Sequence, residues 1–344
     1  MDKVVISAAT TASAQGTGST PGPAAEDNET GARNRPSGQE PRDPLEDAPG
    51  RVLRQVTRVR NGAVLEHAES DAIAVETPVA MEFNGINHAV MLATPTDLED
   101  FAWGFCLTEG IVRSADDIRD IEQEHTAQGI ILHVQIGPAC MQFLKERRRQ
   151  MAGRTACGLC GVETLDAVRR LPVVAPATTS AHSNHSASPP SGNHFDLSNI
   201  PASMTLSQLL DGMAALREQQ TLHLSTGATH AAAWLQAGSE IPSFIREDVG
   251  RHNALDKTIG ALLRHDRHPD KGALLVSSRA SFEMVQKTAM AGCPILAAVS
   301  APTSAAIALA EETGVTLLGF TRSQQATLYA HPNRFQLSNK GRTS

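Results

Sequence analysis

The chain has 344 residues, five cysteines and a formal net charge of −7. Its length suits about two domains with a substantial core, and its negative charge argues against a nucleic-acid partner. No apolar run approaches the ~18 residues that span a membrane, and no basic segment leading into an apolar one opens the chain. We therefore expect no membrane partner and a cytoplasmic protein, and the odd cysteine count suits a reducing compartment better than a disulfide framework.

Composition divides the chain into six stretches. Small, polar and charged residues dominate the first stretch, and Thr, Ser, Pro, Asn and His dominate the fourth, so neither has the apolar content of a packed core. The predicted organisation is a disordered tail (1–50), an N-terminal α+β part (51–155), a cysteine loop and helix (156–172), a low-complexity insertion (173–200), a C-terminal α/β part (201–336) and a short tail (337–344).

The N-terminal part is predicted to begin with strands. Asn84-Gly85 has the composition of a hairpin turn. Thr96-Asp-Leu-Glu99 predicts a capping box that opens a helix running to about Thr108 and ending at Gly110. A basic helix follows over 143–151. Apolar and alternating runs predict the strands 52–59, 71–75, 79–83, 88–92, 118–122 and 130–136.

Two thiols, Cys157 and Cys160, lie in a glycine-containing loop directly before a predicted helix that begins near Val162. Unpaired N–H groups and the positive end of the helix dipole favour a thiolate at such a position. Cations close in sequence would lower the thiol pKa further if they fold nearby; they are Lys145, Arg147, Arg148, Arg149 and Arg154.

Four interpretations of this loop compete. Half of a zinc site would need a second ligand pair, and the sequence offers none, so no metal is expected. Two ordinary buried cysteines fit poorly with two glycines and five nearby cations. A thioredoxin-like redox pair and a thiol that carries sulfur covalently both remain, because the spacing alone does not distinguish them. Of the other cysteines, Cys106 and Cys293 are predicted in the core, and Cys140 is uninformative.

The C-terminal part alternates apolar strands with helices of about ten residues. This pattern predicts βαβ crossovers and a sheet covered on both faces. The predicted helices are 206–217, 253–264, 282–291 and 305–312, and the predicted strands are 231–235, 244–247, 274–277, 295–299 and 315–320.

Polar loops follow three of these strands, and ligands bind beyond the carboxyl ends of strands in such sheets. The loops are Ser277-Ser278-Arg279, Ser300-Ala-Pro-Thr303 and Thr321-Arg322-Ser-Gln-Gln325. The first two lead into helix N-termini, which suit phosphate oxygens, and Arg279 and Arg322 can add bidentate contacts.

A denser polar stretch runs from Arg246 to Lys257 through a glycine turn between a strand and a helix. It is either a binding site or an internal network of salt bridges and caps, and the residues alone favour neither. No Rossmann glycine fingerprint or P-loop occurs.

Together these stretches resemble the formate dehydrogenase accessory sulfurtransferase (FdhD) family. The resemblance spans about residues 51–335 and rests on Thr155-Ala-Cys157-Gly-Leu-Cys160-Gly161, the Arg246–Lys257 stretch, Ser278–Lys287 and Leu318-Gly-Phe320. It implies an α/β fold, with a cytidine-deaminase-like three-layer α/β/α C-terminal part beside a smaller α+β N-terminal part, and a homodimer.

The resemblance also implies a function. A cysteine desulfurase would donate sulfur to Cys157 as a persulfide, with Cys160 assisting. The sulfur would pass to the molybdenum bis-molybdopterin guanine dinucleotide cofactor, bound as substrate, before formate dehydrogenase receives it. The implied cofactor-binding residues are Phe320, Thr321, Arg322, Ser323, Gln324, Gln325, Ser278, Arg279, Arg251 and His252. Gln324-Gln325 replaces a Gly-Arg pair common in the family, which removes one cation.

Two rival functions remain as hypotheses. A zinc-dependent base deaminase would use His-x-Glu and Pro-Cys-x-x-Cys motifs. The chain contains His67-Ala-Glu69, but Ala156 replaces the proline. A non-catalytic scaffold that binds the cofactor would not need Cys157 at all.

Overall fold

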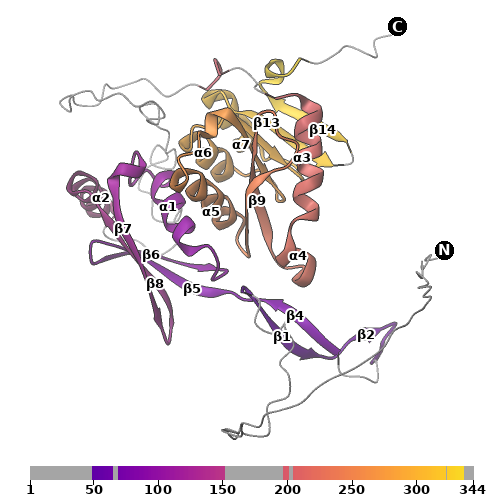
Figure 1. Cartoon of the computed structure of the whole chain (residues 1–344), viewed down its shortest axis with the longest axis horizontal. Helices are drawn as coiled ribbons and strands as arrows, with labels where there is room; N and C mark the ends of the chain where they lie inside the picture. Colours follow the sequence, from indigo (N-terminus) through magenta and orange to yellow (C-terminus); the bar gives the residue numbers. More distant parts are fainter. Residues whose placement is uncertain (1–48, 65–68, 152–196, 201–203, 323, 337–344) are drawn as a thin grey trace, which may run out of the picture. The chain divides into compact units, whose positions relative to one another are not determined.

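The computed structural model describes residues 49–64, 69–151, 197–200, 204–322 and 324–336, all within one compact unit (Figure 1). The predicted tails, the cysteine loop and most of the predicted insertion lie outside the described residues. None of the helices in the described ranges is long and apolar enough to cross a membrane.

The first described strands form two small antiparallel ribbons. β1 (Arg51–Val56) pairs with β4 (Glu69–Ala74), and β2 (Val59–Arg60) pairs with β3 (Ala63–Val64). Asn61 and Gly62 between the latter two both have positive φ, as a tight hairpin turn requires. The single strand predicted over 52–59 is therefore two strands.

A four-stranded sheet in the order β6-β5-β8-β7 follows. Asn84 and Gly85, with φ of 47° and 80°, form the predicted hairpin turn between the first two of its strands in the chain. Alternate side chains of β5 and β8 are buried on one face, which explains why the alternation of apolar residues predicted these two strands. The strands are β5 (Thr77–Phe83), β6 (Ile86–Ala93), β7 (Ile118–Thr126) and β8 (Gly129–Ile136).

The helix α1 (Leu98–Thr108) connects this sheet to the rest of the core. Its N-cap is Asp97 in a left-handed conformation without a side-chain cap hydrogen bond, so the predicted capping box at Thr96 is wrong. The carboxylate of Asp97 instead lies 3.3 Å from Arg246 Nε. The basic helix α2 (Pro138–Met151) begins five residues earlier than predicted and includes Cys140.

A six-stranded sheet in the order β10-β9-β11-β12-β13-β14 forms the C-terminal part. Three adjacent strands, β11, β12 and β13, are parallel to one another, and the other three pairings of neighbouring strands are antiparallel. The strands are β9 (His230–Gln236), β10 (Ser243–Asp248), β11 (Gly272–Val276), β12 (Ile295–Ala298), β13 (Thr316–Arg322) and β14 (Gln325–Ala330).

Helices cover both faces of this sheet, as predicted (Figure 1). One face packs against α5 (Arg251–Arg264), α6 (Phe282–Met290) and α7 (Ser304–Thr313), and the other packs against α3 (Leu206–Glu218). The fold is therefore α/β. Short elements complete it: α4 (Thr221–Thr226) and the 3-10 turns Ala115–Asp117, Pro269–Lys271 and Pro332–Arg334.

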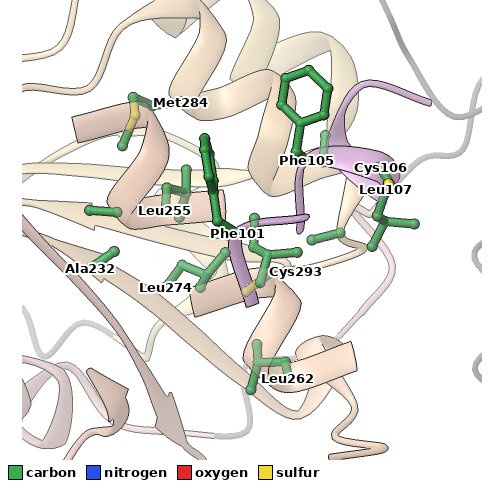
Figure 2. Close-up of a cluster of buried hydrophobic side chains, with 14 of the residues drawn as sticks. Phe101, Phe105, Cys106, Leu107, Ala232, Leu255, Leu262, Leu274, Met284 and Cys293 are labelled. Carbon is green, nitrogen blue, oxygen red and sulfur yellow. The ribbon is translucent and has the colours of Figure 1, made fainter. Parts of the chain in front are cut away.

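The core is continuous from α1 to the large sheet. Figure 2 shows Phe101 and Phe105 of α1 in one buried cluster with Leu255 of α5, Leu274 of β11 and Met284 of α6. Two glycines let α1 and α5 approach closely. A Cβ on Gly104 would lie 1.8 Å from the carbonyl oxygen of Asp256, and one on Gly260 would lie 1.8 Å from that of Asp100.

Candidate functional site at the sheet edge

The carboxyl ends of β10, β11, β12 and β13 lie at the same edge of the large sheet, because these strands run in the same direction. Backbone contacts join the loops there. Ser300 N–H donates to the Ser278 carbonyl at 3.3 Å, and Phe320 N–H donates to the Ser300 carbonyl at 3.4 Å. The three polar loops singled out in the sequence are thus neighbours, and ligands of α/β sheets bind at such edges.

The first loop has one inward and one outward side chain. The hydroxyl of Ser278 is buried and donates to the carbonyl oxygen of Arg279 at 3.0 Å. The Arg279 side chain is exposed and forms no ion pair within the described residues. The Arg279 guanidinium is therefore available to a ligand, whereas the Ser278 hydroxyl is used in a hydrogen bond within the loop.

The third loop contains Phe320, whose φ of 52° is unusual for a bulky residue. Its side chain is 39% exposed. Thr321 next to it is fully buried, and its hydroxyl donates to the Ala298 carbonyl at 2.7 Å, which anchors β13 to β12. The backbone turn thus presents an aromatic ring at the edge while the threonine stabilises the sheet.

The remainder of this loop forms the turn between β13 and β14. Arg322 and Gln325 are exposed and pair across the hairpin. Gln324, with φ of 58°, donates from Nε2 to Asp211 Oδ1 of α3 at 2.7 Å. Ser323 lies outside the described residues. Arg322 is the cation that this turn can offer.

Most of the Arg246–Lys257 stretch forms an internal network. Lys257 Nζ and Asp248 Oδ2 lie 2.7 Å apart with both side chains fully buried. Asp248 also accepts the Thr94 N–H at 2.9 Å, and Lys257 donates to the Thr94 carbonyl at 2.9 Å. Burial lowers the pKa of Lys257, and the neighbouring Asp248 opposes that shift. The salt-bridge alternative therefore describes these residues, which tie the β10–α5 junction to the segment after β6.

Other members of the stretch have equally specific partners. Arg246 binds Asp100 of α1 at 2.7 Å, and Asp256 binds Lys287 of α6 at 2.8 Å. Glu247 accepts the backbone N–H groups of Leu222 and His223 at 2.8 and 2.7 Å, which caps α4.

Arg251 and His252 differ from the rest because they reach the surface. His252 Nε2 lies 3.3 Å from Ser281 Oγ and 3.1 Å from Glu283 Oε2 at the start of α6. Burial, followed by repulsion from Arg251 and Lys287, lowers the pKa of His252 to about 3. The imidazole is therefore neutral at neutral pH, and its Nε2 proton is assigned toward the Glu283 carboxylate.

Three of the five cysteines are described, and none favours the thiolate form. Cys106 and Cys293 are buried, as predicted, and burial raises the pKa of both thiols, that of Cys293 to about 12. Burial and the nearby Asp117 raise the pKa of the Cys140 thiol to about 11. Cys157 and Cys160 lie outside the described residues.

The residues of the deaminase hypothesis are not assembled in the described part of the chain. His67 lies outside it, and Glu69 pairs with Arg58 at 2.5 Å on an exposed ribbon. Within the described ranges, no group of three or more His, Cys, Asp or Glu side chains is arranged to hold a metal ion.

Sequence reasoning missed several residues that support the edge. Thr94 and Asp100 carry no local signal, since their partners lie more than 140 positions away. His223 and His230 flank the β9 start and were not singled out either. Glu283 could have been identified from the sequence, because it lies in the first turn of a predicted helix within the Ser278–Lys287 stretch.

The amino-acid sequence of the chain is similar to those of known proteins. The model of the FdhD/NarQ family matches residues 74–336. The Sulfur carrier protein FdhD of Bordetella parapertussis is 54% identical over 288 residues, covering 84% of this chain and 96% of that protein. The protein of the same name from Cupriavidus necator is 49% identical over 281 residues, covering 82% and 88% of the two chains.

A solved structure has the same fold. The crystal structure of a formate dehydrogenase accessory protein from Desulfotalea psychrophila superposes with a TM-score of 0.59 at 21% identity. The match covers 84% of this chain and 100% of the other. At this identity the likeness is one of fold.

Proposed function

This chain belongs to the FdhD/NarQ family, and from that premise we propose that it is a sulfur carrier required for formate dehydrogenase activity. The observation that carries the proposal is the 54% identity to a protein named Sulfur carrier protein FdhD over 96% of that protein's length. The described cysteines support it by elimination, because raised thiol pKa values disfavour Cys106, Cys140 and Cys293 as nucleophiles.

Sulfur loading would occur at Cys157. Its thiolate attacks the outer sulfur of a cysteine desulfurase persulfide. The sulfur–sulfur bond of the desulfurase breaks, a new one forms at Cys157, and the desulfurase thiolate leaves. The exchange needs no external oxidant or reductant, so the protein acts as a sulfurtransferase with a persulfide intermediate.

Sulfur release would use Cys160. Its thiolate attacks Sγ of Cys157, which forms a disulfide and expels the carried sulfur as hydrosulfide. A dithiol reductant then returns the pair to two thiols. The acceptor is the molybdenum of the bis-molybdopterin guanine dinucleotide, which the carrier binds as a substrate before formate dehydrogenase receives it.

The sheet edge is the proposed binding site for that substrate. Arg279 and Arg322 are exposed cations for phosphate oxygens. The helices α6 and α7 begin at the same edge, and the N-cap Ser281 of α6 makes no side-chain cap hydrogen bond, whereas Thr303 caps α7. Phe320 offers an exposed aromatic ring for stacking. Gln324 donates a hydrogen bond to Asp211. Because Gln324-Gln325 replaces the family's Gly-Arg pair, Arg322 is the positive charge that this turn offers to a phosphate.

We also propose partners, a cellular compartment and an oligomeric state for this protein. A cysteine desulfurase and formate dehydrogenase are its partners, the cytoplasm is its compartment and a homodimer is its assembly. Light scattering on the purified chain measures the last point, and a monomer at all concentrations would contradict it.

Intact mass spectrometry tests the sulfur-carrier function. The full chain is incubated with a cysteine desulfurase and cysteine, and we expect a mass gain of about one sulfur atom that reducing agents remove. Cys157→Ala should lose this gain and fail to restore formate dehydrogenase in cells that lack the carrier.

Cys140→Ala is the matched control, since its thiol is partly exposed but has a raised pKa. It should load sulfur like the unchanged chain. A Cys157→Ala variant that still supports formate dehydrogenase would leave a cofactor-binding scaffold as the better description, and stoichiometric zinc with no loading would favour the deaminase hypothesis.

A further inference from the structure

Four basic side chains gather where β9 begins and β10 ends, and we call them the histidine–arginine cluster: His223, His230, Arg251 and His252. His230 opens β9 and pairs in register with Asp248 at the end of β10. Arg251 and His252 follow in the first turn of α5, and His223 lies on α4. All four are exposed or half-buried, so a solute can reach them.

The side chains of the cluster act on one another electrostatically. Burial lowers the pKa of His230, and repulsion from Arg251 and then from His223 lowers it further. Arg251 and His230 also contribute to the lowered pKa of His252. The imidazoles of His230 and His252 therefore stay neutral at a pH where an isolated one begins to take up a proton.

The cluster has unused hydrogen-bonding capacity. Arg251 Nε is buried without a hydrogen-bond partner in the described part of the chain. His223 Nδ1 donates to the Thr229 carbonyl at 2.7 Å, which leaves its Nε2 pointing away from that bond. His252 uses Nε2 toward Ser281 and Glu283, which leaves Nδ1 for a further contact.

The neighbouring carboxylates neutralise the cluster only in part, because two of them are held mainly by donors outside it. Glu247 accepts N–H groups of α4 and the Thr229 hydroxyl. Asp248 is buried against Lys257. Glu283 is the carboxylate that contacts the cluster directly, at His252, and Lys287 on the same helix is paired with Asp256.

The N-terminus of α5 adds donors at the same place. This helix has 14 residues, and its N-cap, Gly250, supplies no side-chain hydrogen bond. The N–H groups of its first turn and the positive end of its dipole favour an anion beside Arg251 and His252.

We propose that the histidine–arginine cluster binds a phosphate-type dianion and that its histidines take up protons from solvent when the anion binds. The inference rests on the proposed function only for the source of that anion, which is the diphosphate of the substrate nucleotide. The site lies at the sheet edge beside the Ser278–Arg279 loop, as the Ser281 contact of His252 requires.

Proton uptake follows from the charge balance of the cluster. In the free protein burial and neighbouring positive charges disfavour protonation of His230 and His252, and a bound dianion would oppose this effect by raising their pKa values. Between the free and the bound pKa the complex holds more protons than the free protein. Affinity for the anion should therefore rise as the pH falls through this window.

Isothermal titration calorimetry on the full chain tests the proposal with inorganic sulfate, whose charge is constant between about pH 6 and pH 8. We expect severalfold tighter binding at the lower pH. Repeating the titration in buffers of different ionisation enthalpy should reveal net proton uptake. Inorganic pyrophosphate and guanosine diphosphate form two further arms, and tighter binding of the nucleotide would support the nucleotide as the source.

Variants assign the effect to the cluster. Arg251→Gln should weaken sulfate binding roughly tenfold at both pH values, and His230→Gln should reduce proton uptake and flatten the pH dependence. Arg267→Gln and His268→Gln are the matched controls, because both residues are exposed beyond the other end of α5, and they should bind like the unchanged chain.

Several outcomes would overturn the proposal. Equal sulfate affinity at both pH values in the unchanged chain would refute proton-coupled binding without reliance on any variant. Unchanged affinity in Arg251→Gln would refute the location, and a nucleotide that binds no better than pyrophosphate would refute its source. Because the titration does not measure sulfur loading, failed loading with intact anion binding would count against the sulfur-carrier function alone.

Discussion

At the scale of single residues, the surroundings of the three described cysteines determine their chemistry. Burial raises the pKa of the thiols of Cys106 and Cys293, and Asp117 adds to the effect of burial at Cys140. A thiol that stays protonated is a poor nucleophile. The fold therefore disfavours sulfur exchange at these three cysteines, which agrees with the proposal that Cys157 carries the sulfur.

Phe320 is the second residue where local structure matters, because its left-handed backbone conformation strains a bulky side chain. We expect Phe320→Gly to be more stable than Phe320→Ala by about 1 kcal/mol, since glycine adopts positive φ without a Cβ clash. Urea denaturation of the two variants measures this difference.

The alanine variant is the internal control, since both changes remove the same aromatic ring. Equal stability of the two variants would mean that the left-handed conformation of residue 320 is unstrained. Loss of substrate binding in both variants would indicate that the exposed ring contacts the ligand.

At the scale of elements, the crossing of α1 and α5 depends on the absence of two side chains. Gly104→Ala and Gly260→Ala should each lower the free energy of unfolding by about 2–3 kcal/mol, because the added methyl would overlap backbone atoms of the facing helix. The higher helix propensity of alanine, worth about 1 kcal/mol, offsets only part of this cost. Urea midpoints give the measurement.

Gly137→Ala is the matched control for the helix crossing. Its Cβ would meet nothing closer than the Asp117 carbonyl at 3.9 Å, and its φ is not in the left-handed region. It should unfold within about 0.5 kcal/mol of the unchanged chain. Equal losses in all three variants would show that the tight crossing is not the cause.

Most of the elements could be predicted because their apolar runs are long and bounded by glycine. Gly110, Gly292 and Gly314 all have positive φ beyond the helices that they end. β14 was missed because it follows β13 after two residues and begins at Gln325, the last residue of the expected binding loop. α4 was missed because six residues give too little periodicity.

The site was predictable only in outline. Parallel strands place their carboxyl ends together, so the meeting of the Ser278, Ser300 and Phe320 loops followed from the strand pattern. Which polar groups face inward did not follow, because Asp248 and Thr94 are 154 positions apart in the chain. Such pairs depend on tertiary packing, which local sequence patterns do not encode.

At the scale of the whole molecule, stability should depend on pH through the half-buried imidazoles of His230 and His252. His252 has a pKa lowered to about 3, against 6.5 in the unfolded chain. Between these values the unfolded state binds a proton that the folded state does not, so the folded protein loses stability as the pH falls below 6.5. His230 shifts in the same direction, whereas Glu124 and Glu82 raise the pKa of His133 and partly offset the loss.

We expect His252→Asn to reduce the stability lost between about pH 7 and pH 5 by roughly 1–2 kcal/mol. Urea unfolding at the two pH values measures it, and His268→Asn should lose as much as the unchanged chain. A variant at position 252 with the full loss would show that other groups set the acid sensitivity.

The shared role of α1 has a consequence for the order of events during synthesis. Its residues, Leu98–Thr108, leave the ribosome long before Arg251–Arg264, against which they pack. Until α5 has been synthesised, the apolar face of α1 has no helix to pack against. The long segment between the two helices must then bring them together before the core can form. Chaperone dependence should therefore be greatest while the ribosome translates the stretch between these two helices.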